Sequence, residues 1–154
     1  FKRFFMIKNI KVRYAEKQDL PAVYALVKAL AVFEKEPDAV TSTVEEYAEA
    51  FESGLIGIKI AENETEILGI ALYYDTFSTW KGKMLYLEDF IVQEKYRSLG
   101  IGKLLFDAVI NEAHLRKCNM MKWQVLEWNQ PAINFYKKYK ADLDPEWING
   151  KLFL

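Results

Sequence analysis

The apolar residues of this sequence change their spacing several times, and this alternation limits the folds that the chain can adopt. Five segments have the short apolar pattern that is typical of strands: residues 10–14, 57–61, 66–74, 83–92 and 121–126. Four others repeat their apolar residues every three to four positions, as helices do: residues 20–31, 44–51, 100–117 and 131–139. We expect the tail, residues 142–154, to add one or two short strands around Asn149-Gly150. The sequence therefore predicts an α+β fold with a mixed, mostly antiparallel sheet of six to seven strands and about four helices on its faces.

Local signals support several of these boundaries. Asp19 stands just before Pro21 and is expected to cap the first helix. The run Thr43-Val44-Glu45-Glu46 has the form of a capping box, which predicts the start of the second helix. The polar stretch from Glu62 to Thr65 predicts a hairpin turn between two strands.

Length and composition indicate one globular domain over residues 1–154, with residues 1–9 as a ragged N-terminus. Apolar residues make up 51% of the chain and charged residues 28%, which argues against disorder. The formal charge of −1 gives no basic field to attract nucleic acid or a membrane surface. The apolar stretch Ile67–Tyr74 is too short to cross a bilayer, and no signal peptide is expected.

The cysteine and histidine content bears on compartment and metal binding. Cys118 is the single cysteine, so no internal disulfide can form and a reducing, cytoplasmic location is expected. The sequence has one histidine, His114, and we expect no metal site.

The most informative short stretch, Arg97-Ser98-Leu99-Gly100-Ile101-Gly102, lies between a predicted strand and a well-patterned helix. A helix start leaves backbone N–H groups unpaired and carries a partial positive charge, so it can bind an anion. Glycines let a phosphate approach the backbone, and Arg97 adds a charged donor. Taken alone, two glycines fit a helix start without any ligand equally well.

Three motifs in order carry a resemblance to a known family. Arg97-x-x-Gly100-x-Gly102 resembles the pyrophosphate loop of the GNAT acetyltransferase superfamily. The stretch Tyr86–Phe90 before this loop and the stretch Glu127–Tyr136 after it resemble the diamine group, the spermidine/spermine N-acetyltransferases. The likeness extends from about Val12 to the C-terminus. It implies an acetyl-CoA-dependent N-acetyltransferase that acts on a small cationic amine such as a diamine or polyamine.

The resemblance also implies which residues bind the donor, acetyl-CoA. Residues of the loop and of the first helical turn would hold the pyrophosphate: Arg97, Ser98, Leu99, Gly100, Ile101, Gly102 and Lys103. Phe90, Ile91 and Val92 would bond the pantetheine arm through their main chain, where the family splays two neighbouring strands apart. Four residues would line the other side of the donor: Asn129, Gln130, Pro131 and Ala132.

The chemistry requires a base for the acceptor. A primary alkylamine has a pKa near 10.4, so forming the neutral nucleophile at pH 7 costs roughly 4–5 kcal/mol. The resemblance places Glu88 at the acceptor site, where its carboxylate would attract the cation and accept its proton directly or through water. Its neighbour Asp89 is expected on the opposite face of the same strand. The alternative for Glu88 is an exposed strand carboxylate.

The resemblance further makes Tyr136 the general acid that protonates the departing thiolate, and a tyrosine hydroxyl keeps its proton at pH 7. The alternative is that Phe135-Tyr136 belongs to an aromatic core stripe.

Phe33 and Glu34 match the segment that helps bind the polyamine, although the family's tyrosine is replaced by Phe33. Lys140 replaces a usual glycine, so the following turn can differ.

Other readings stay open. The acceptor could be thialysine or another amino-acid-like amine, whose carboxylate would need a cationic partner. The chain could instead bind coenzyme A without catalysis, although Glu88 and Tyr136 argue against this. The resemblance implies a homodimer.

Overall fold

The computed structural model describes residues 9–154, so the expected ragged N-terminus lies, except for Asn9, outside the described residues. The chain divides into two compact units, one that extends to Trp123 and one that comprises Gln124–Leu154, and each is described by itself. Among residues 9–154 no helix has the length and apolar content needed to cross a bilayer.

The first unit contains one five-stranded sheet in the order β1-β2-β3-β4-β5. Its strands are β1 (Lys11–Tyr14), β2 (Gly57–Glu62), β3 (Ile67–Ser78), β4 (Gly82–Val92) and β5 (Met120–Trp123). The pairs β1–β2, β2–β3 and β3–β4 are antiparallel, whereas β4 and β5 are parallel. The mixed, mostly antiparallel α+β architecture is confirmed.

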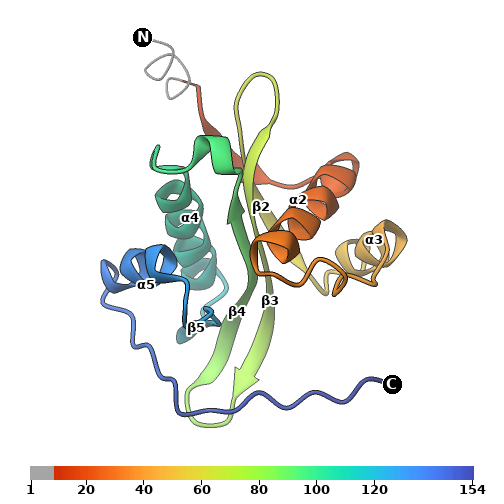
Figure 1. The fold of residues 1–154 in the computed structure, drawn as a ribbon. Coiled ribbons are helices and arrows are strands. Elements are labelled where there is room, and N and C mark those ends of the chain that lie inside the picture. Colours follow the sequence, from red (N-terminus) through yellow and green to blue (C-terminus); the bar gives the residue numbers. More distant parts are fainter. Residues whose placement is uncertain (1–8) are drawn as a thin grey trace. The chain divides into compact units, whose positions relative to one another are not determined.

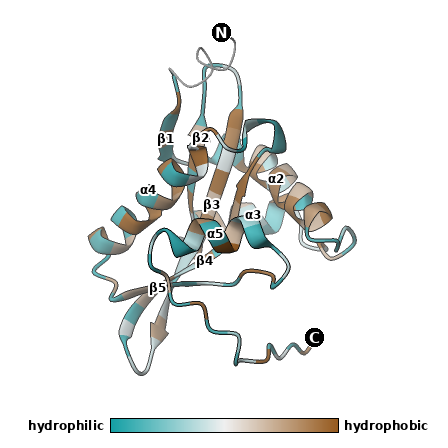
Figure 2. Cartoon of the chain, turned by 60° about the vertical axis from the view of Figure 1, so that its left-hand side comes forward, coloured by the Kyte–Doolittle hydropathy of each residue, from teal (hydrophilic) through white to brown (hydrophobic). Residues whose placement is uncertain are grey.

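Helices cover both faces of this sheet. Helices α2 (Leu20–Phe33) and α3 (Val44–Glu52) lie on one side of the sheet and α4 (Ile101–Leu115) on the other (Figure 1). Val23, Val27 and Phe51 pack with Ile60 and Ile70 on the first face. Ile101 and Leu105 of α4 pack with Ala61 and Leu68 on the second face. Along α4, hydrophobic and hydrophilic residues alternate as expected for a helix with one buried face (Figure 2).

The second unit contains one helix, α5 (Gln130–Lys137), among its described residues. The prediction of six to seven strands is wrong, since residues 142–154 form no strand. Apolar residues in this tail are exposed: Trp147, Ile148, Leu152, Phe153 and Leu154. A strand is stable only where a neighbouring strand pairs its backbone groups, and the described part of this unit contains no other strand.

The capping box at the start of α3 is confirmed in both directions. The hydroxyl of Thr43 accepts a hydrogen bond from the N–H of Glu46 at 3.2 Å, and the Glu46 carboxylate accepts one from the N–H of Thr43 at 2.6 Å. In the turn between β2 and β3, the Asn63 side chain accepts from the N–H groups of Thr65 and Glu66. The predicted turn at residues 62–65 is therefore confirmed, and the amide of Asn63 organises it.

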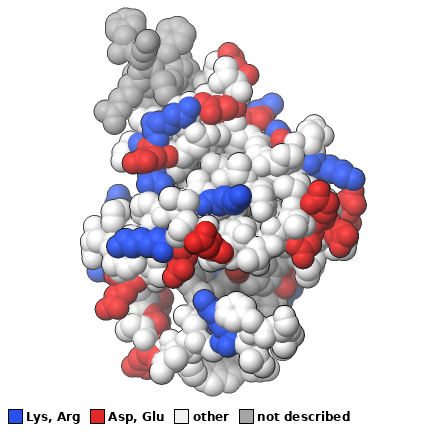
Figure 3. Space-filling model, turned by 45° about the vertical axis from the view of Figure 1, so that its right-hand side comes forward, with Lys and Arg blue, Asp and Glu red and all other residues white. Residues whose placement is uncertain are grey.

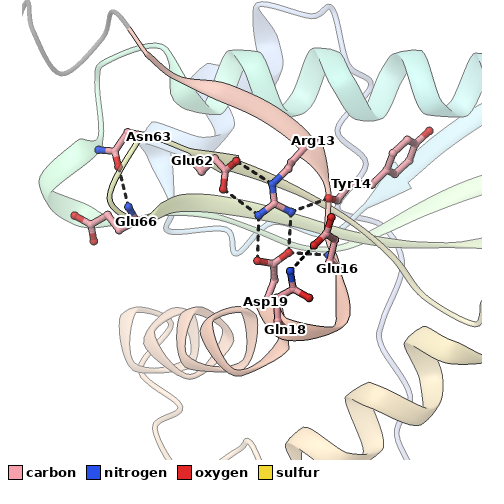
Figure 4. A network of polar contacts seen from close by, with 8 residues as sticks. All are labelled: Arg13, Tyr14, Glu16, Gln18, Asp19, Glu62, Asn63 and Glu66. Carbon is pink, nitrogen blue, oxygen red and sulfur yellow. Dashed lines mark hydrogen bonds and ion pairs between the residues drawn. The ribbon is translucent and has the colours of Figure 1, made fainter.

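Asp19 occupies the N-cap position of α2, but its carboxylate does not cap that helix. It accepts hydrogen bonds from Arg13 at 2.8 and 3.1 Å and from the N–H of Glu16 (Figure 4). Arg13 also donates two hydrogen bonds to Glu62 of β2. The guanidinium therefore joins β1, β2 and the start of α2, and it lowers the pKa of Asp19.

Candidate active site

The turn before α4 has the backbone shape that brings N–H groups to the surface. Ser98 and Gly100 adopt left-handed φ angles of 63° and 82°, and Gly100 is the N-cap residue. A Cβ atom at Gly100 would meet no heavy atom within 4 Å, so the space beside this residue is open. A helix start with open space beside its N-cap residue suits an anion such as a pyrophosphate.

Arg97 connects this turn to α2. Its Nε donates to the backbone carbonyl of Val92 at 3.1 Å, and its guanidinium carbon lies 4.8 Å from the centre of the Phe33 ring. Phe33, which was predicted to bind the acceptor, therefore contacts Arg97, which was predicted to bind the donor. The last turn of α2 thus lies beside the turn that precedes α4.

β4 continues past the end of its pairing with β5. The parallel ladder joins Met84–Leu87 to Met120–Trp123, whereas β4 extends to Val92. On their other edge, Phe90, Ile91 and Val92 pair with residues 69–71 of β3. The three residues predicted to bind pantetheine thus lie in the part of β4 beyond the β5 ladder.

Glu88 lies at a β-bulge in β4. Leu72 of β3 pairs with Asp89, and the next residue, Tyr73, pairs with Leu87, so Glu88 is the extra residue of β4. The prediction that Glu88 and Asp89 occupy opposite faces is wrong, because both line the same pocket. Simple alternation along a strand fails at this point because the bulge inserts one residue.

The pocket has a volume of about 320 Å³ and lies between α3 and the central strands. Its lining residues are Ser42, Glu46, Tyr47, Ala50, Ile56, Leu72, Glu88 and Asp89. Three of these residues are acidic and none is lysine or arginine. Figure 3 shows the side that carries α2 and α3, where the coloured, described residues include acidic side chains and scattered basic ones. Such a pocket suits a cation with an apolar body.

The acidic side chains of this region influence one another. Burial, together with the negative charges of Glu88 and Glu34, raises the pKa of Asp89 to about 6. Burial also raises the pKa of Glu34. The Tyr74 hydroxyl donates a hydrogen bond to the Glu88 carboxylate at 3.0 Å. The charges of Glu34 and Glu88 therefore both act on Asp89.

The remaining predicted residues lie in the second unit. Asn129 is the N-cap of α5 and its side chain accepts from the N–H of Ala132 at 3.3 Å. Gln130 and Pro131 follow in the first turn. Tyr136 is buried, and its ring meets that of Phe135 at 5.5 Å between centroids. The structure thus brings the loop, β4 and acidic residues together in one unit, and the α5 residues in the other.

Comparison with protein families adds to this geometry. The model of the acetyltransferase (GNAT) family matches residues 18–140, which is most of the chain. The chain belongs to the GNAT family.

Two curated relatives are similar to this GNAT chain over most of its length. Human spermidine/spermine N(1)-acetyltransferase-like protein 1 is 37% identical over 146 residues, which cover 88% of this chain and 21% of the human protein. Thialysine N-epsilon-acetyltransferase of Bos taurus is 33% identical over 142 residues, or 86% of this chain and 84% of the bovine protein. The chain therefore spans about a fifth of the first relative and most of the second.

Solved structures support the fold. An aminoglycoside acetyltransferase from an uncultured soil metagenomic sample has a TM-score of 0.79 at 18% identity, over 94% of this chain and 96% of that one. An acetyltransferase of Trypanosoma brucei has a TM-score of 0.74 at 19% identity, over 94% of this chain and 100% of that one. At these identities the likeness shows the GNAT fold alone.

Sequence reasoning missed several residues of the GNAT pocket. Glu46, Tyr47 and Ile56 line it, but the capping box in the sequence indicated only that a helix begins at this point. Tyr74, the hydrogen-bond donor to Glu88, stands on the neighbouring strand. The strand register that brings Tyr74 near Glu88 has no local sequence signal, because the bulge sets it.

Proposed function

We propose that this GNAT protein transfers an acetyl group from acetyl-CoA directly to a primary amine of a small cationic acceptor, a diamine or polyamine. One observation carries the proposal above the others. An acidic pocket, with no basic lining residue among residues 9–154, opens at Glu88, the position on β4 just past the end of the β5 ladder. Residues 97–103, which form the turn after β4 and the start of α4, would bind the anionic part of the donor.

The donor side is proposed to use backbone groups. The open space at Gly100 and the start of α4 fit a pyrophosphate, which Ser98–Lys103 would hold mainly through N–H groups, with Arg97 as a charged donor. The main chain of Phe90–Val92 would bind the pantetheine arm. Acetyl-CoA supplies a thioester that is reactive toward a neutral amine. Asn129–Ala132 are proposed as further donor contacts, on the family resemblance.

The acceptor side is proposed to use two carboxylates. An ammonium group would be attracted by Glu88 and Asp89, which line one pocket. Glu88 would then accept the ammonium proton, directly or through water, and pass it to solvent; forming the neutral amine in this way at pH 7 costs roughly 4–5 kcal/mol. The hydrogen bond from Tyr74 orients the Glu88 carboxylate. Glu34 would add negative charge at the acceptor site.

The pocket chemistry favours a polyamine over thialysine. Thialysine carries a carboxylate, which calls for a cationic partner, whereas none of the described residues that line the pocket is lysine or arginine. The similarity to a bovine thialysine N-epsilon-acetyltransferase keeps this amine as the second candidate. We further propose a single catalytic domain, a homodimer and a cytoplasmic location, on the resemblance and on the single Cys118.

Steady-state assays with acetyl-CoA and spermidine, spermine, putrescine or thialysine test the proposal. We expect the highest kcat/KM with a di- or polyamine, with the acetylated amine identified by mass spectrometry. Preference for thialysine would move the acceptor assignment to amino-acid-like amines. Tight coenzyme A binding with no acetylated amine from any acceptor would instead support a non-catalytic module.

The pKa of Asp89 leads to a pH-dependent prediction. Since this pKa is about 6, Asp89 is neutral at pH 5 and charged at pH 7.5, so the KM for the amine should fall as pH rises through 6. In an Asp89→Asn variant we expect this KM to be about fivefold higher at pH 7.5 and to depend less on pH. Asp38→Asn is the control. An unchanged pH profile in Asp89→Asn would remove Asp89 from the acceptor site.

Tyr136 is proposed as the acid that protonates the departing thiolate, a role that rests on the resemblance. Tyr136→Phe keeps the ring and removes only the hydroxyl. We expect kcat to fall about 10²-fold, the lower end of what a positioned acid contributes. Tyr139→Phe, three residues along the chain, is the matched control. Full kcat in Tyr136→Phe would leave this tyrosine as an aromatic core residue.

A further inference from the structure

The segment between β4 and α4 is held to the start of β3 by one carboxylate. Glu66 accepts hydrogen bonds from three side chains of this segment. Its Oε1 accepts from Lys95 Nζ at 2.9 Å and from the Tyr96 hydroxyl, and its Oε2 accepts from Gln93 Nε2 at 3.2 Å. These bonds lower the pKa of Glu66, with that from Tyr96 contributing most, so the carboxylate is charged at neutral pH.

Gln93 strengthens the same connection. Its side-chain amide donates to the carbonyl of Ile67 at 2.6 Å, and its backbone N–H donates to the carbonyl of Leu68 at 2.8 Å. Both carbonyls belong to the first residues of β3, directly after Glu66. The beginning of the segment is therefore bonded to β3 through side chains and backbone together.

Tyr96 transmits this connection to α4. The residue is 7% exposed and belongs to a core cluster with Ile101 and Leu105, which lie in the first two turns of that helix. Arg97 follows Tyr96, and Ser98 then takes its left-handed φ. The position of Tyr96 thus sets where the turn leaves the core and where the N–H groups at residues 98–103 point.

We propose that Glu66 is a positioning residue for the donor: by bonding Gln93, Lys95 and Tyr96 it presets the turn that receives the pyrophosphate of acetyl-CoA. The inference rests on the proposed function, since it assumes that the donor's pyrophosphate lies at residues 97–103. Glu66 itself touches no reacting atom. Its loss would let the turn take other conformations, and binding of the donor would then have to order it.

The test compares two donors in steady-state kinetics. Acetyl-CoA has the pyrophosphate, whereas S-acetylpantetheine lacks it but keeps the thioester and the pantetheine arm. For Glu66→Ala we expect the KM for acetyl-CoA to rise about tenfold, with kcat and the KM for the amine within about twofold of the wild-type values. With S-acetylpantetheine the KM should stay within about twofold.

The loss of the negative charge of Glu66 cannot by itself raise the KM for acetyl-CoA. Removing a negative side chain near the donor would by itself favour an anionic ligand, so a weaker affinity in Glu66→Ala reports lost positioning. Glu64→Ala is the matched control, because Glu64 lies in the same turn but accepts a hydrogen bond from Asn9 instead. We expect its KM for acetyl-CoA to be equal to or lower than that of the wild type.

Tyr96→Phe provides a second variant in case Glu66→Ala folds poorly, because it keeps the ring in the core and removes one hydroxyl. It should raise the KM for acetyl-CoA about threefold and leave that for S-acetylpantetheine unchanged. An unchanged KM for acetyl-CoA in variants that fold, or an equal rise with both donors, would overturn the role of Glu66. If the wild type does not distinguish the two donors, the proposed pyrophosphate site fails and this inference fails with it.

Discussion

Replacing Glu88 with glutamine is expected to lower kcat/KM for the amine about 10²–10⁴-fold at pH 7, the range that a positioned base contributes. Glutamine keeps the shape of the side chain and can still accept the hydrogen bond that Tyr74 donates at 3.0 Å. It cannot accept the proton of an ammonium group. The measurement is the initial rate of amine acetylation as a function of amine concentration.

The pH dependence separates a base from a structural residue. As pH rises toward the amine's pKa, near 10.4, more of the acceptor is already neutral, so the deficit of Glu88→Gln should shrink. Glu49→Gln on α3 is a carboxylate control outside the lining of the pocket. A deficit of equal size at every pH, or one matched by Glu49→Gln, would contradict the assignment of Glu88 as the base.

The fold could be predicted where local signals and periodicity act together. The expected capping box at Thr43 forms, and the strand expected at residues 83–92 is β4, Gly82–Val92. These features depend on residues close together in the sequence. The tail shows the limit of this approach, because strands were predicted there around Asn149-Gly150, whereas Trp147 and Ile148 are exposed in irregular backbone. Strand formation depends on a partner that no local pattern reveals.

For the candidate site too, some residues could be predicted from local sequence signals and others could not. The turn at residues 97–102 could be found from its glycines, since a left-handed φ such as that of Gly100 favours that residue type. The acidic pocket could be found only in part. Glu88 was identified through the resemblance, but a bulge in β4 is what lets Glu88 and Asp89 line the same pocket. Glu46, another lining residue, comes from a helix far away in the sequence. Register and packing between distant segments decide such arrangements.

Gly69 is the residue whose substitution is expected to destabilise the fold most. It pairs with Val92, the last residue of β4. A Cβ atom at this position would lie 2.7 Å from the carbonyl oxygen of Ile91 and 3.1 Å from a methyl group of Leu105. The first of these contacts is with backbone, which cannot move aside as a side chain can. Gly69→Val should therefore lower the free energy of unfolding by about 3 kcal/mol or more.

Chemical denaturation of Gly69→Val and of Gly150→Val, which has open space around its Cβ position, measures this cost. We expect Gly150→Val to change the free energy of unfolding by less than about 0.5 kcal/mol. The close packing at Gly69 bears on function as well as on folding. At Gly69, α4 and the end of β4 approach β3 more closely than a side chain permits, and these two elements flank the turn proposed to bind the donor. Equal stability of both variants would show that this close approach is not required.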